Sequence, residues 1–524
     1  MNRDHMLAAL DGGTWDLIVI GGGATGLGAA VDASARGYRT LLLEQGDFAQ
    51  GTSSRSTKLV HGGVRYLKQG NVALVLEALQ ERGLMYGNAP HLVGDLGFVV
   101  PRYRWWEGPF YGIGLKLYDR LARRLSFAPS RLLKPAATID RIPNVETRHL
   151  LGGVLYYDGL FDDARMAITL ARTAADAGAV LLNYTGVCGL LKAEGDICGV
   201  QCRDAETGRE YEVRARAVIN ATGIFADHVR TLDDAESTPL IAPSQGVHLV
   251  LDRAFLPGDT ALMVPQTDDG RVLFAIPWLG RIVVGTTDTA VPGPELEPRP
   301  RREEIDFILR NAARYLERDP TADDILSAFA GQRPLVVDTG LGDSAATKTL
   351  NREHSVLISD SGLVTIAGGK WTTYRRMAED VVDAAAALAE LPARPSPTRD
   401  LHLRGWLPRV RAELEPAPQR SYGADLPQLR QLLAAESGWE APLHPRLPYA
   451  AGEVVWAARC EMARTVEDVL ARRTRSLLLD ARASVEAAPR AAALLAAELG
   501  RDAAWQRAQV EAYESLARGY LPDA

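Results

Sequence analysis

The chain has 524 residues, 47% of them hydrophobic, and a formal net charge of −7 at pH 7. This length and apolar content are sufficient for two or three domains with their own cores. The acidic balance argues against nucleic acid as the main partner, because proteins that bind nucleic acid carry a basic excess.

The cysteines and the N-terminal residues bear on the cellular compartment. Cys188, Cys198, Cys202 and Cys460 form no CxxC pair and no disulfide framework, so we expect a reducing cytoplasm and no metal site. Residues 1–14 lack the apolar core of a signal peptide, and no uninterrupted apolar run is long enough to span a bilayer. The sequence therefore predicts neither secretion nor insertion into a membrane.

The first predicted element is a buried strand, residues 17–20, that continues through a glycine-rich turn into a helix. In this pattern Gly21 allows the tight turn, Gly23 lets the backbone approach a phosphate, and Gly26 lets helix and strand pack closely. A second apolar strand ends at Glu44, the acid expected to bind a pair of ribose hydroxyls. The pattern predicts a dinucleotide-binding domain. The alternative, a βα turn without a ligand, is an entropically costly use of three clustered glycines.

A loop rich in hydroxyl groups follows Glu44. Residues 52–58 supply hydroxyls and backbone amides suited to a pyrophosphate, and Lys58 adds a charge-assisted contact. His61 precedes two glycines that permit close approach to a flat ring, so we assign it to cofactor placement rather than proton transfer. A solvated Ser/Thr loop with helix caps is the alternative. The candidate residues are Thr52, Ser53, Ser54, Thr57, Lys58, His61, Gly62 and Gly63.

Residues 98–134 combine basic and aromatic side chains in an otherwise acidic protein. Only Glu107 and Asp119 oppose the basic residues, a composition typical of a segment at a membrane surface. A helical cap with a solvated basic face explains the pattern equally well. The basic residues are Arg102, Arg104, Lys116, Arg120, Arg123, Arg124, Arg131 and Lys134, and the aromatic ones are Tyr103, Trp105, Trp106, Phe110, Tyr111, Tyr118 and Phe127.

The middle of the chain alternates between two predicted domains. Apolar segments between residues 180 and 213 predict a short antiparallel meander, and residues 217–220 predict a central strand that returns to the first domain. From this region we add Val187, Ala221, Thr222 and Gly223 to the candidate cofactor site. β-like runs between residues 248 and 285 then indicate a separate, β-rich block, which we interpret as a substrate domain.

The next predicted unit again consists of a strand, a glycine turn and a helix, beginning near residue 363. Its helix N-terminus would stabilise negative charge on a cofactor ring, although an ordinary βα turn is the alternative. It contributes the candidates Gly369, Lys370, Trp371 and Thr372. After a proline-rich linker at residues 392–397, helical spacing around residues 454–469 and 481–499 predicts a helical domain without a catalytic constellation.

Four separated segments resemble the FAD-dependent glycerol-3-phosphate dehydrogenases of the aerobic bacterial and mitochondrial type. They are residues 20–37, 52–67, 331–335 and 368–375, and residues 453–474 resemble the C-terminal domain of that family. The first segment is shared with many flavoproteins. The second and fourth together are much more specific.

The resemblance implies an α/β fold, in which a Rossmann-like FAD-binding domain of the glutathione-reductase/D-amino-acid-oxidase type is interleaved with a β-rich substrate domain and followed by an α-helical C-terminal domain. The predicted boundaries are 12–84, 151–236 and 331–391 for the FAD-binding domain, 85–150 for a cap or membrane-facing segment, 237–330 for the substrate domain and 396–524 for the helical domain.

The implied substrate is sn-glycerol 3-phosphate, whose phosphate carries close to two negative charges and requires cations near the flavin. Arg65, Arg333 and Lys370 are the candidates, and Tyr66 follows Arg65 in the flavin-facing loop. A guanidinium can hold phosphate oxygens bidentately. Each arginine alone is more often a surface residue, but three cations on separate flavin-contacting motifs favour a phosphate site.

The implied reaction removes hydride from C2 of the substrate to flavin N5 while a base takes the C2 hydroxyl proton, which yields dihydroxyacetone phosphate. His248 matches the active-site histidine of the family and has the intrinsic pKa of a base near neutral pH. Arg333 would stabilise the oxyanion, and Lys370 completes the catalytic candidates. A strand histidine bonded to backbone is the alternative for His248. The family commonly has lysine and serine where this chain has Gln245 and Val247, which leaves substrate affinity open.

The family passes its electrons to a membrane quinone, so we expect a cytoplasmic protein, peripheral on the inner face of the cell membrane. The sequence leaves the oligomeric state open, with a homodimer as one option. Two other functions are compatible with the motifs. One is an oxidase that passes electrons to oxygen, acting on an amino acid, a hydroxy acid or glycerol 3-phosphate. The other is a flavin-binding scaffold without catalysis.

Overall fold

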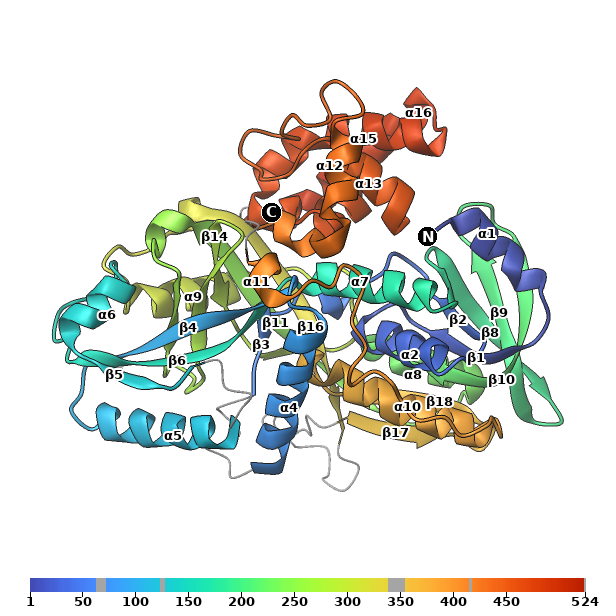
Figure 1. The fold of residues 1–524 in the computed structure, drawn as a ribbon, viewed down its shortest axis with the longest axis horizontal. Helices are drawn as coiled ribbons and strands as arrows, with labels where there is room; N and C mark the ends of the chain where they lie inside the picture. The colour runs from blue at the N-terminus through green and yellow to red at the C-terminus, as the bar shows by residue number, and fades with distance from the viewer. Residues whose placement is uncertain (63–71, 123–127, 338–353, 414–416, 523–524) are drawn as a thin grey trace.

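The computed structural model describes residues 1–524 except 63–71, 123–127, 338–353, 414–416 and 523–524. Figure 1 shows two β-rich bodies side by side, with the helical C-terminal segment above the junction between them. Each body is built around one sheet, and the strands that form each sheet come from separate parts of the chain.

The first sheet has the strand order β17-β18-β10-β1-β2-β7. β1 lies parallel to β2 and β10, and β18 lies parallel to β10, as a nucleotide-binding fold requires. The predicted meander is confirmed, because β8 (Thr185–Ala193), β9 (Asp196–Asp204) and β10 pair antiparallel. The strands of the main path are β1 (Trp15–Ile20), β2 (Thr40–Leu43), β7 (Val180–Leu182), β10 (Glu210–Asn220), β17 (His354–Ile358) and β18 (Leu363–Gly368).

Helix α2 (Ala24–Ala35) packs between α7 (Asp163–Asp176) and α10 (Tyr374–Leu388) against this sheet. Their apolar faces share one buried core with β1 and β2. The predicted strand–turn–helix units at both ends of this domain are therefore confirmed, and each presents a helix N-terminus at the carboxyl end of a parallel strand.

The second sheet has the order β15-β11-β14-β13-β12-β4-β6-β3, with β16 beside β11 and β5 beside β6. Its strands are β3 (Leu59–Val60), β4 (Val93–Arg102), β5 (Arg131–Leu133), β6 (Gly152–Phe161), β11 (Ile241–Asp252), β12 (Thr260–Val264), β13 (Leu273–Trp278), β14 (Arg281–Gly285), β15 (Thr289–Ala290) and β16 (Ile325–Val336).

The second sheet corrects three predicted boundaries. β4 lies in the segment predicted as a cap, and β6 lies in the segment predicted as cofactor domain, yet the two pair with each other inside the second sheet. β16 crosses the predicted boundary at residue 330 and pairs with β11 along its whole length. The reason is that a strand can pair with a partner far away in sequence, and local periodicity does not reveal which partner that is.

Helices and short turns complete the architecture. The other helices that the structure describes outside the C-terminal domain are α1 (Arg3–Ala8), α4 (Val72–Asn88), α5 (Glu107–Ala122), α6 (Pro135–Arg141), α8 (Ala226–Asp233) and α9 (Arg302–Ala313). The short 3-10 turns are Ala9–Asp11, Thr52–Ser54, Gly223–Phe225, Arg253–Phe255, Ala322–Asp324, Trp371–Thr373 and Gln419–Asp425.

The C-terminal domain is helical, as predicted, but the region around residues 454–469 is not one helix. α13 (Gly452–Glu461) ends where Met462 adopts a left-handed conformation with φ 55°, and a π-helical turn (Asp468–Arg473) follows. The other helices are α11 (Arg409–Ala412), α12 (Leu426–Leu433), α14 (Ser476–Leu479), α15 (Ala481–Leu499) and α16 (Ala503–Arg518). Its core includes Phe329 and Trp278 of the second sheet.

Buried ion pairs join the C-terminal domain to the first domain. Asp47 is completely buried and accepts hydrogen bonds from Arg472 Nε at 2.5 Å and Arg473 Nη2 at 2.8 Å. Burial alone would raise the pKa of Asp47, but the guanidinium groups of Arg473 and Arg472 outweigh it and lower the pKa to about 2. The carboxylate therefore stabilises the folded protein above its ordinary pKa, and this contribution is lost as the pH falls towards 2.

Replacing Asp47 should strongly destabilise the protein. We expect Asp47→Ala to cost about 3–5 kcal/mol, because it leaves two buried guanidinium groups uncompensated. Urea denaturation at pH 7 measures the change. The control is Asp11→Ala at the exposed Arg209–Asp11 pair, which should cost at most about 0.5 kcal/mol. Equal stability of the two variants would contradict the importance of this junction.

Candidate functional site

The glycine turn between β1 and α2 has the predicted geometry. Gly21 has φ 109°, and a Cβ there would lie 2.7 Å from the carbonyl oxygen of Ala221. A Cβ on Gly26 would lie 1.9 Å from the carbonyl oxygen of Gly21, so only glycine allows helix and strand to pack this closely. Gly23 is the N-cap of α2 and faces the Ser53 hydroxyl. The turn therefore presents backbone N–H groups where a pyrophosphate would be bound.

Glu44 closes the far side of this turn. Its carboxylate accepts hydrogen bonds from the backbone N–H of Gly22 at 2.6 Å and of Gly46 at 2.8 Å. Burial raises the pKa of Glu44, while these two bonds oppose the rise. The acid thus lies at the end of β2, beside the glycine turn, as a ribose-binding residue must.

The loop after Glu44 is hydrogen-bonded to the end of β18. The Ser53 hydroxyl accepts from the Ala24 N–H at 2.9 Å, and the Ser53 carbonyl accepts from Trp371 Nε1 at 2.9 Å. The Thr372 hydroxyl donates to the His61 carbonyl at 3.5 Å. Gly369 follows β18 directly, with the predicted helix α10 beyond it. Segments far apart in the sequence therefore meet at one edge of the first sheet.

The remaining cofactor candidates lie on neighbouring elements. Ala221, Thr222 and Gly223 follow β10, and the Thr222 hydroxyl donates to Asn220 Oδ1 at 2.7 Å. Val187 lies in β8, which contacts β2. Thr52 donates its hydroxyl to the Gln332 carbonyl at 2.6 Å and so joins this edge to β16.

Lys58 differs from the prediction. Its ammonium is fully buried and donates to Asp163 at 2.6 Å and to the Ser54 carbonyl at 2.8 Å. A cation held in this way does not offer the predicted charge-assisted contact to a pyrophosphate, because its side chain has no exposed surface and two of its three N–H groups bind protein oxygens. Gly63, Arg65 and Tyr66 lie outside the described residues, so their predicted roles stay predictions.

His248 lies in β11 with its ring almost completely buried. Its Nε2 is hydrogen-bonded to the Thr57 hydroxyl at 2.9 Å, and its ring stacks on Phe329 at 4.9 Å between centroids. Burial lowers the pKa of His248 well below its usual value, the positive charges of Lys58 and Arg333 lower it further, and Asp163 opposes them. The imidazole is therefore neutral at pH 7. Among the described residues, Nδ1 has no hydrogen-bond partner.

Arg333 lies in β16 and converges on the same place. It pairs with Ser244 across the β11–β16 ladder, and a Cβ on Gly246 would lie 2.2 Å from its Nη2. The guanidinium donates to Asp288 Oδ1 at 3.2 Å and to the Thr287 carbonyl at 3.1 Å. It remains partly exposed, with 28% of its side-chain surface accessible.

The two departures from the resembled family lie on the other face of β11. Because side chains alternate along a strand, Gln245 and Val247 point away from the face that carries Ser244, Gly246 and His248. Gln245 Nε2 donates to Glu304 at 2.8 Å, and Val247 belongs to the apolar core of the second sheet. Neither residue occupies the surface where Arg333 and His248 meet.

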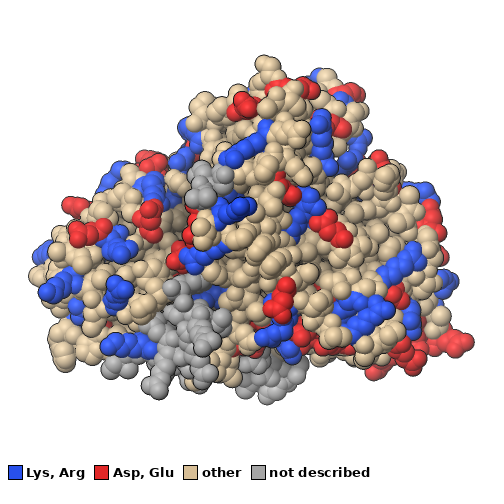
Figure 2. Space-filling model, in the orientation of Figure 1, with Lys and Arg blue, Asp and Glu red and all other residues tan. Residues whose placement is uncertain are grey.

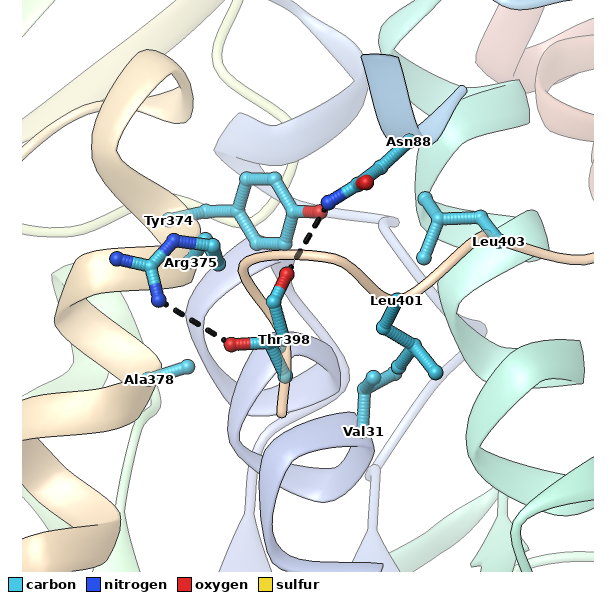
Figure 3. Close-up of a pocket in the computed structure, with 9 residues that line it drawn as sticks. Val31, Asn88, Tyr374, Arg375, Ala378, Thr398, Leu401 and Leu403 are labelled. Carbon is cyan, nitrogen blue, oxygen red and sulfur yellow. Dashed lines mark hydrogen bonds between the residues drawn. The ribbon is translucent and has the colours of Figure 1, made fainter. Parts of the chain in front are cut away.

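Two described cavities lie elsewhere. A void of about 10 Å³ lies between Tyr374, Val31 and the segment that leads to the C-terminal domain. Figure 3 shows the side chains that line it. Thr398 closes it, accepting from Asn88 Nδ2 at 3.1 Å and from Arg375 Nη1 at 3.2 Å. This void has room for one water molecule at most. A second cavity, of about 140 Å³, lies at the junction with the C-terminal domain, and its lining includes neither His248 nor Arg333.

Comparisons with known proteins agree with this geometry. A family model described as "FAD dependent oxidoreductase" matches residues 16–375, and one described as "C-terminal domain of alpha-glycerophosphate oxidase" matches residues 364–506. The mitochondrial glycerol-3-phosphate dehydrogenase of Bos taurus is 41% identical in an alignment that covers 97% of this chain and 73% of the bovine protein. The corresponding Homo sapiens protein is 41% identical over 95% of this chain and 72% of its own length.

The chain belongs to the FAD-dependent glycerol-3-phosphate dehydrogenase family. A solved structure of the glycerol-3-phosphate dehydrogenase from Bacillus halodurans, complexed with FAD, superposes with a TM-score of 0.81 at 29% identity and covers 99% of this chain and 97% of its own. The L-alpha-glycerophosphate oxidase from Mycoplasma pneumoniae shares the fold, with a TM-score of 0.56 at 18% identity over 73% of this chain and 97% of its own. The predicted fold class is thus confirmed for this family member.

Sequence reasoning missed the polar residues that hold this family member's site together. Asp163 lies at the start of α7, after a strand that was assigned to the wrong domain, so nothing local connected it with Lys58. Thr286 and Asp288 follow β14 and bind the Arg333 guanidinium. Thr286 and Asp288 had a weak signal, namely a polar side chain just after a predicted strand, but only the tertiary fold identifies their partner.

Proposed function

We propose that this protein binds FAD and oxidises sn-glycerol 3-phosphate to dihydroxyacetone phosphate. The observation that carries the proposal is the convergence of His248 and Arg333, through the β11–β16 and Thr52–Gln332 contacts, on the edge that carries the glycine cradle. The relatives named above support the same substrate. When bound, FAD supplies the acceptor for the hydride that leaves C2.

The residues that would hold FAD fit it by position and chemistry. The glycine turn offers N–H groups to a pyrophosphate and Glu44 lies where a ribose would be. The predicted set is kept except for Lys58, whose side chain binds Asp163 and the Ser54 carbonyl. It comprises Gly21, Gly23, Gly26, Glu44, Thr52, Ser53, Ser54, Thr57, His61, Gly62, Gly63, Val187, Ala221, Thr222, Gly223, Gly369, Lys370, Trp371 and Thr372.

His248 takes the C2 hydroxyl proton in this proposal. A base must be unprotonated before the reaction, and the buried, cation-flanked imidazole meets that condition. The bound phosphate brings close to two negative charges, which raise the pKa of the ring and make it a stronger base once substrate is present. In the tautomer in which Nε2–H donates to the Thr57 hydroxyl, Nδ1 is the unprotonated nitrogen, and we place the transferred proton there.

Arg333 stabilises the oxygen at C2 as it loses its proton. Its guanidinium donates to Asp288 Oδ1, the Thr286 hydroxyl and the Thr287 carbonyl. The charge is therefore oriented before substrate binds. Lys370, Arg65 and Tyr66 complete the proposed phosphate site. Of these, only Lys370 is among the described residues, at the turn after β18.

Arg333→Ala tests the proposed reaction. We expect the variant to retain FAD but to lose about a hundredfold or more of its reduction rate, because one preorganised cation is removed from the reacting oxygen. The measurement is anaerobic mixing with sn-glycerol 3-phosphate, followed as bleaching of the flavin absorbance. Arg281→Ala is the control, since the guanidinium of this partly buried residue of β14 donates, within the described ranges, to the Gly280 and Arg446 carbonyls. Unbleached wild-type protein would exclude the dehydrogenase function itself.

We further propose that the electrons pass to a membrane quinone and that the protein docks on the inner face of the cell membrane. No helix in the described ranges is long and apolar enough to cross a bilayer. The surface around α5 is suited to peripheral contact, because Trp105 is 81% exposed beside exposed Phe110 and Leu132. Figure 2 shows basic side chains at the end of the molecule where α5 lies. Arg104, Lys116, Arg131 and Lys134 are exposed there.

Charge reversal on this surface tests the docking. Arg131→Glu with Lys134→Glu should weaken binding to anionic vesicles about tenfold or more, since each basic residue near such a surface contributes about 1 kcal/mol. Vesicle flotation with phosphatidylserine-containing liposomes is the measurement. Arg507→Glu, on exposed α16, serves as the control. Undiminished flotation of the double variant would assign this surface to a solvated cap.

Oxygen is the second candidate acceptor. One observation favours it, namely that the C-terminal family model takes its description from an alpha-glycerophosphate oxidase. Steady-state rates with a short-chain quinone and with oxygen, together with a peroxide assay, distinguish the two. We expect the quinone rate to dominate, and stoichiometric peroxide formation would reverse the assignment.

A further inference from the structure

Lys58 is a buried cation that the proposed reaction does not use. Its ammonium has no exposed surface, and it lies 5.1 Å from the centre of the Phe329 ring and 5.5 Å from that of Trp278. Its backbone has φ 66°, a left-handed conformation that is uncommon for a residue with a side chain. Burial of an ammonium group costs free energy unless strong partners compensate it. The position of Lys58 therefore indicates a specific role.

Two consecutive residues, Thr57 and Lys58, hold His248 in different ways, one by a hydrogen bond and the other through Phe329. Thr57 binds His248 Nε2 through its hydroxyl at 2.9 Å. Lys58, the next residue, places its ammonium against Phe329, on which the His248 ring is stacked. Moving Lys58 would therefore displace both the hydroxyl and the aromatic ring that fix the imidazole.

Asp163 and the C-terminal domain hold this segment in place. Asp163 Oδ2 accepts from Lys58 Nζ, from the Ser56 N–H at 2.9 Å and from the Ser56 hydroxyl at 2.7 Å. Arg475 donates to Asp163 Oδ1 at 3.2 Å and to the Ser54 carbonyl at 2.7 Å. The side chains of Lys58, Asp163 and Arg475 are each at most 1% exposed. A residue of the helical domain thus completes the support of the loop.

The charges around the imidazole come from three elements. Lys58 faces it from the loop, Arg333 from β16 and Asp163 from α7. Behind them lie Arg475 and Asp162 next to Asp163, and Asp288 next to Arg333. Burial has the largest effect on the pKa of His248, Lys58 the next, and Asp163 opposes both. Among the described charges, Lys58 is therefore the one whose removal should most favour protonation of the ring.

We propose that Lys58, held by Asp163 and Arg475, is a positioning residue that fixes Thr57 against His248 and supports the Phe329 ring on which the imidazole stacks. This inference deepens the proposed function and rests on it. It also gives the helical C-terminal domain a part in the chemistry, because Arg475 anchors the carboxylate that binds Lys58.

The test compares Lys58→Met with Lys58→Arg in the FAD-loaded protein. Removing the cation should raise the pKa of His248, so the acidic limb of the pH profile for anaerobic flavin reduction should move to higher pH by about one unit. Lys58→Arg keeps the charge and should restore the wild-type limb. Lys192→Met, which removes a surface lysine paired with Asp233, should leave the limb unchanged.

A second measurement does not depend on turnover. In protein labelled with ¹³C-histidine, the ring signal of His248 is assigned by its loss in His248→Gln and is followed against pH without substrate. We expect Lys58→Met to titrate at higher pH than the wild type. If wild-type flavin is not bleached by sn-glycerol 3-phosphate, the proposed function fails, while this titration still decides the role of Lys58.

Folding of the single variant is addressed by a charge-compensated one. Lys58→Met with Asp163→Asn removes the buried cation and anion together, which proteins tolerate better than an unpaired charge. Since Lys58 acts on the imidazole more strongly than Asp163 does, a smaller shift in the same direction should remain. A lowered rate with an unmoved acidic limb and unmoved ring titration, in either variant, would overturn the proposal and leave Lys58 with a structural role only.

Discussion

The carboxylate of Asp163 is the point on which the arrangement of the site depends. It lies at the start of α7 and accepts hydrogen bonds from the cofactor loop through Ser56 and Lys58, and from the C-terminal domain through Arg475. Burial raises the pKa of Asp163, but Lys58 and Arg475 outweigh it, so the pKa is lowered and the group stays ionised. One anion thus holds two cations from distant parts of the chain in a dry environment.

The antiparallel pairing of β11 with β16 positions the proposed catalytic side chains. Its register places Phe329 opposite His248 and Arg333 opposite Ser244, so the proposed base and the proposed oxyanion-binding cation are brought together by backbone hydrogen bonds. Sheet registers resist slippage when one face is buried, because a shift of one residue would expose the apolar set. The buried Val247 and Leu249 supply that constraint here. The chemistry on one face of β11 is therefore positioned by the hydrophobic packing of the other.

Much of this could be predicted from sequence because the motifs are local. The turn around Gly21, Glu44 at the end of β2 and the strand–turn–helix near Lys370 each depend on residues within a short span, and the structure contains them as expected. The predicted boundaries separate β4 and β6 from the second sheet and divide β16 at residue 330, because pairing between distant strands leaves no periodic signal. For the same reason Lys58 was assigned to a phosphate, since Asp163 is more than a hundred residues away.

The buried charges explain why a helical domain without catalytic residues accompanies this fold. Asp47 and Asp163 are both fully buried anions of the first domain, and both depend on arginines of the short segment 472–475. Without that segment Asp47 would lose both of its guanidinium partners and Asp163 would keep Lys58 but lose Arg475. Uncompensated burial of a carboxylate costs several kcal/mol. The Asp47 junction and the support of the cofactor loop at Asp163 therefore both include side chains of the helical domain. The helical domain thus supplies arginines that stabilise the buried carboxylates beneath the site.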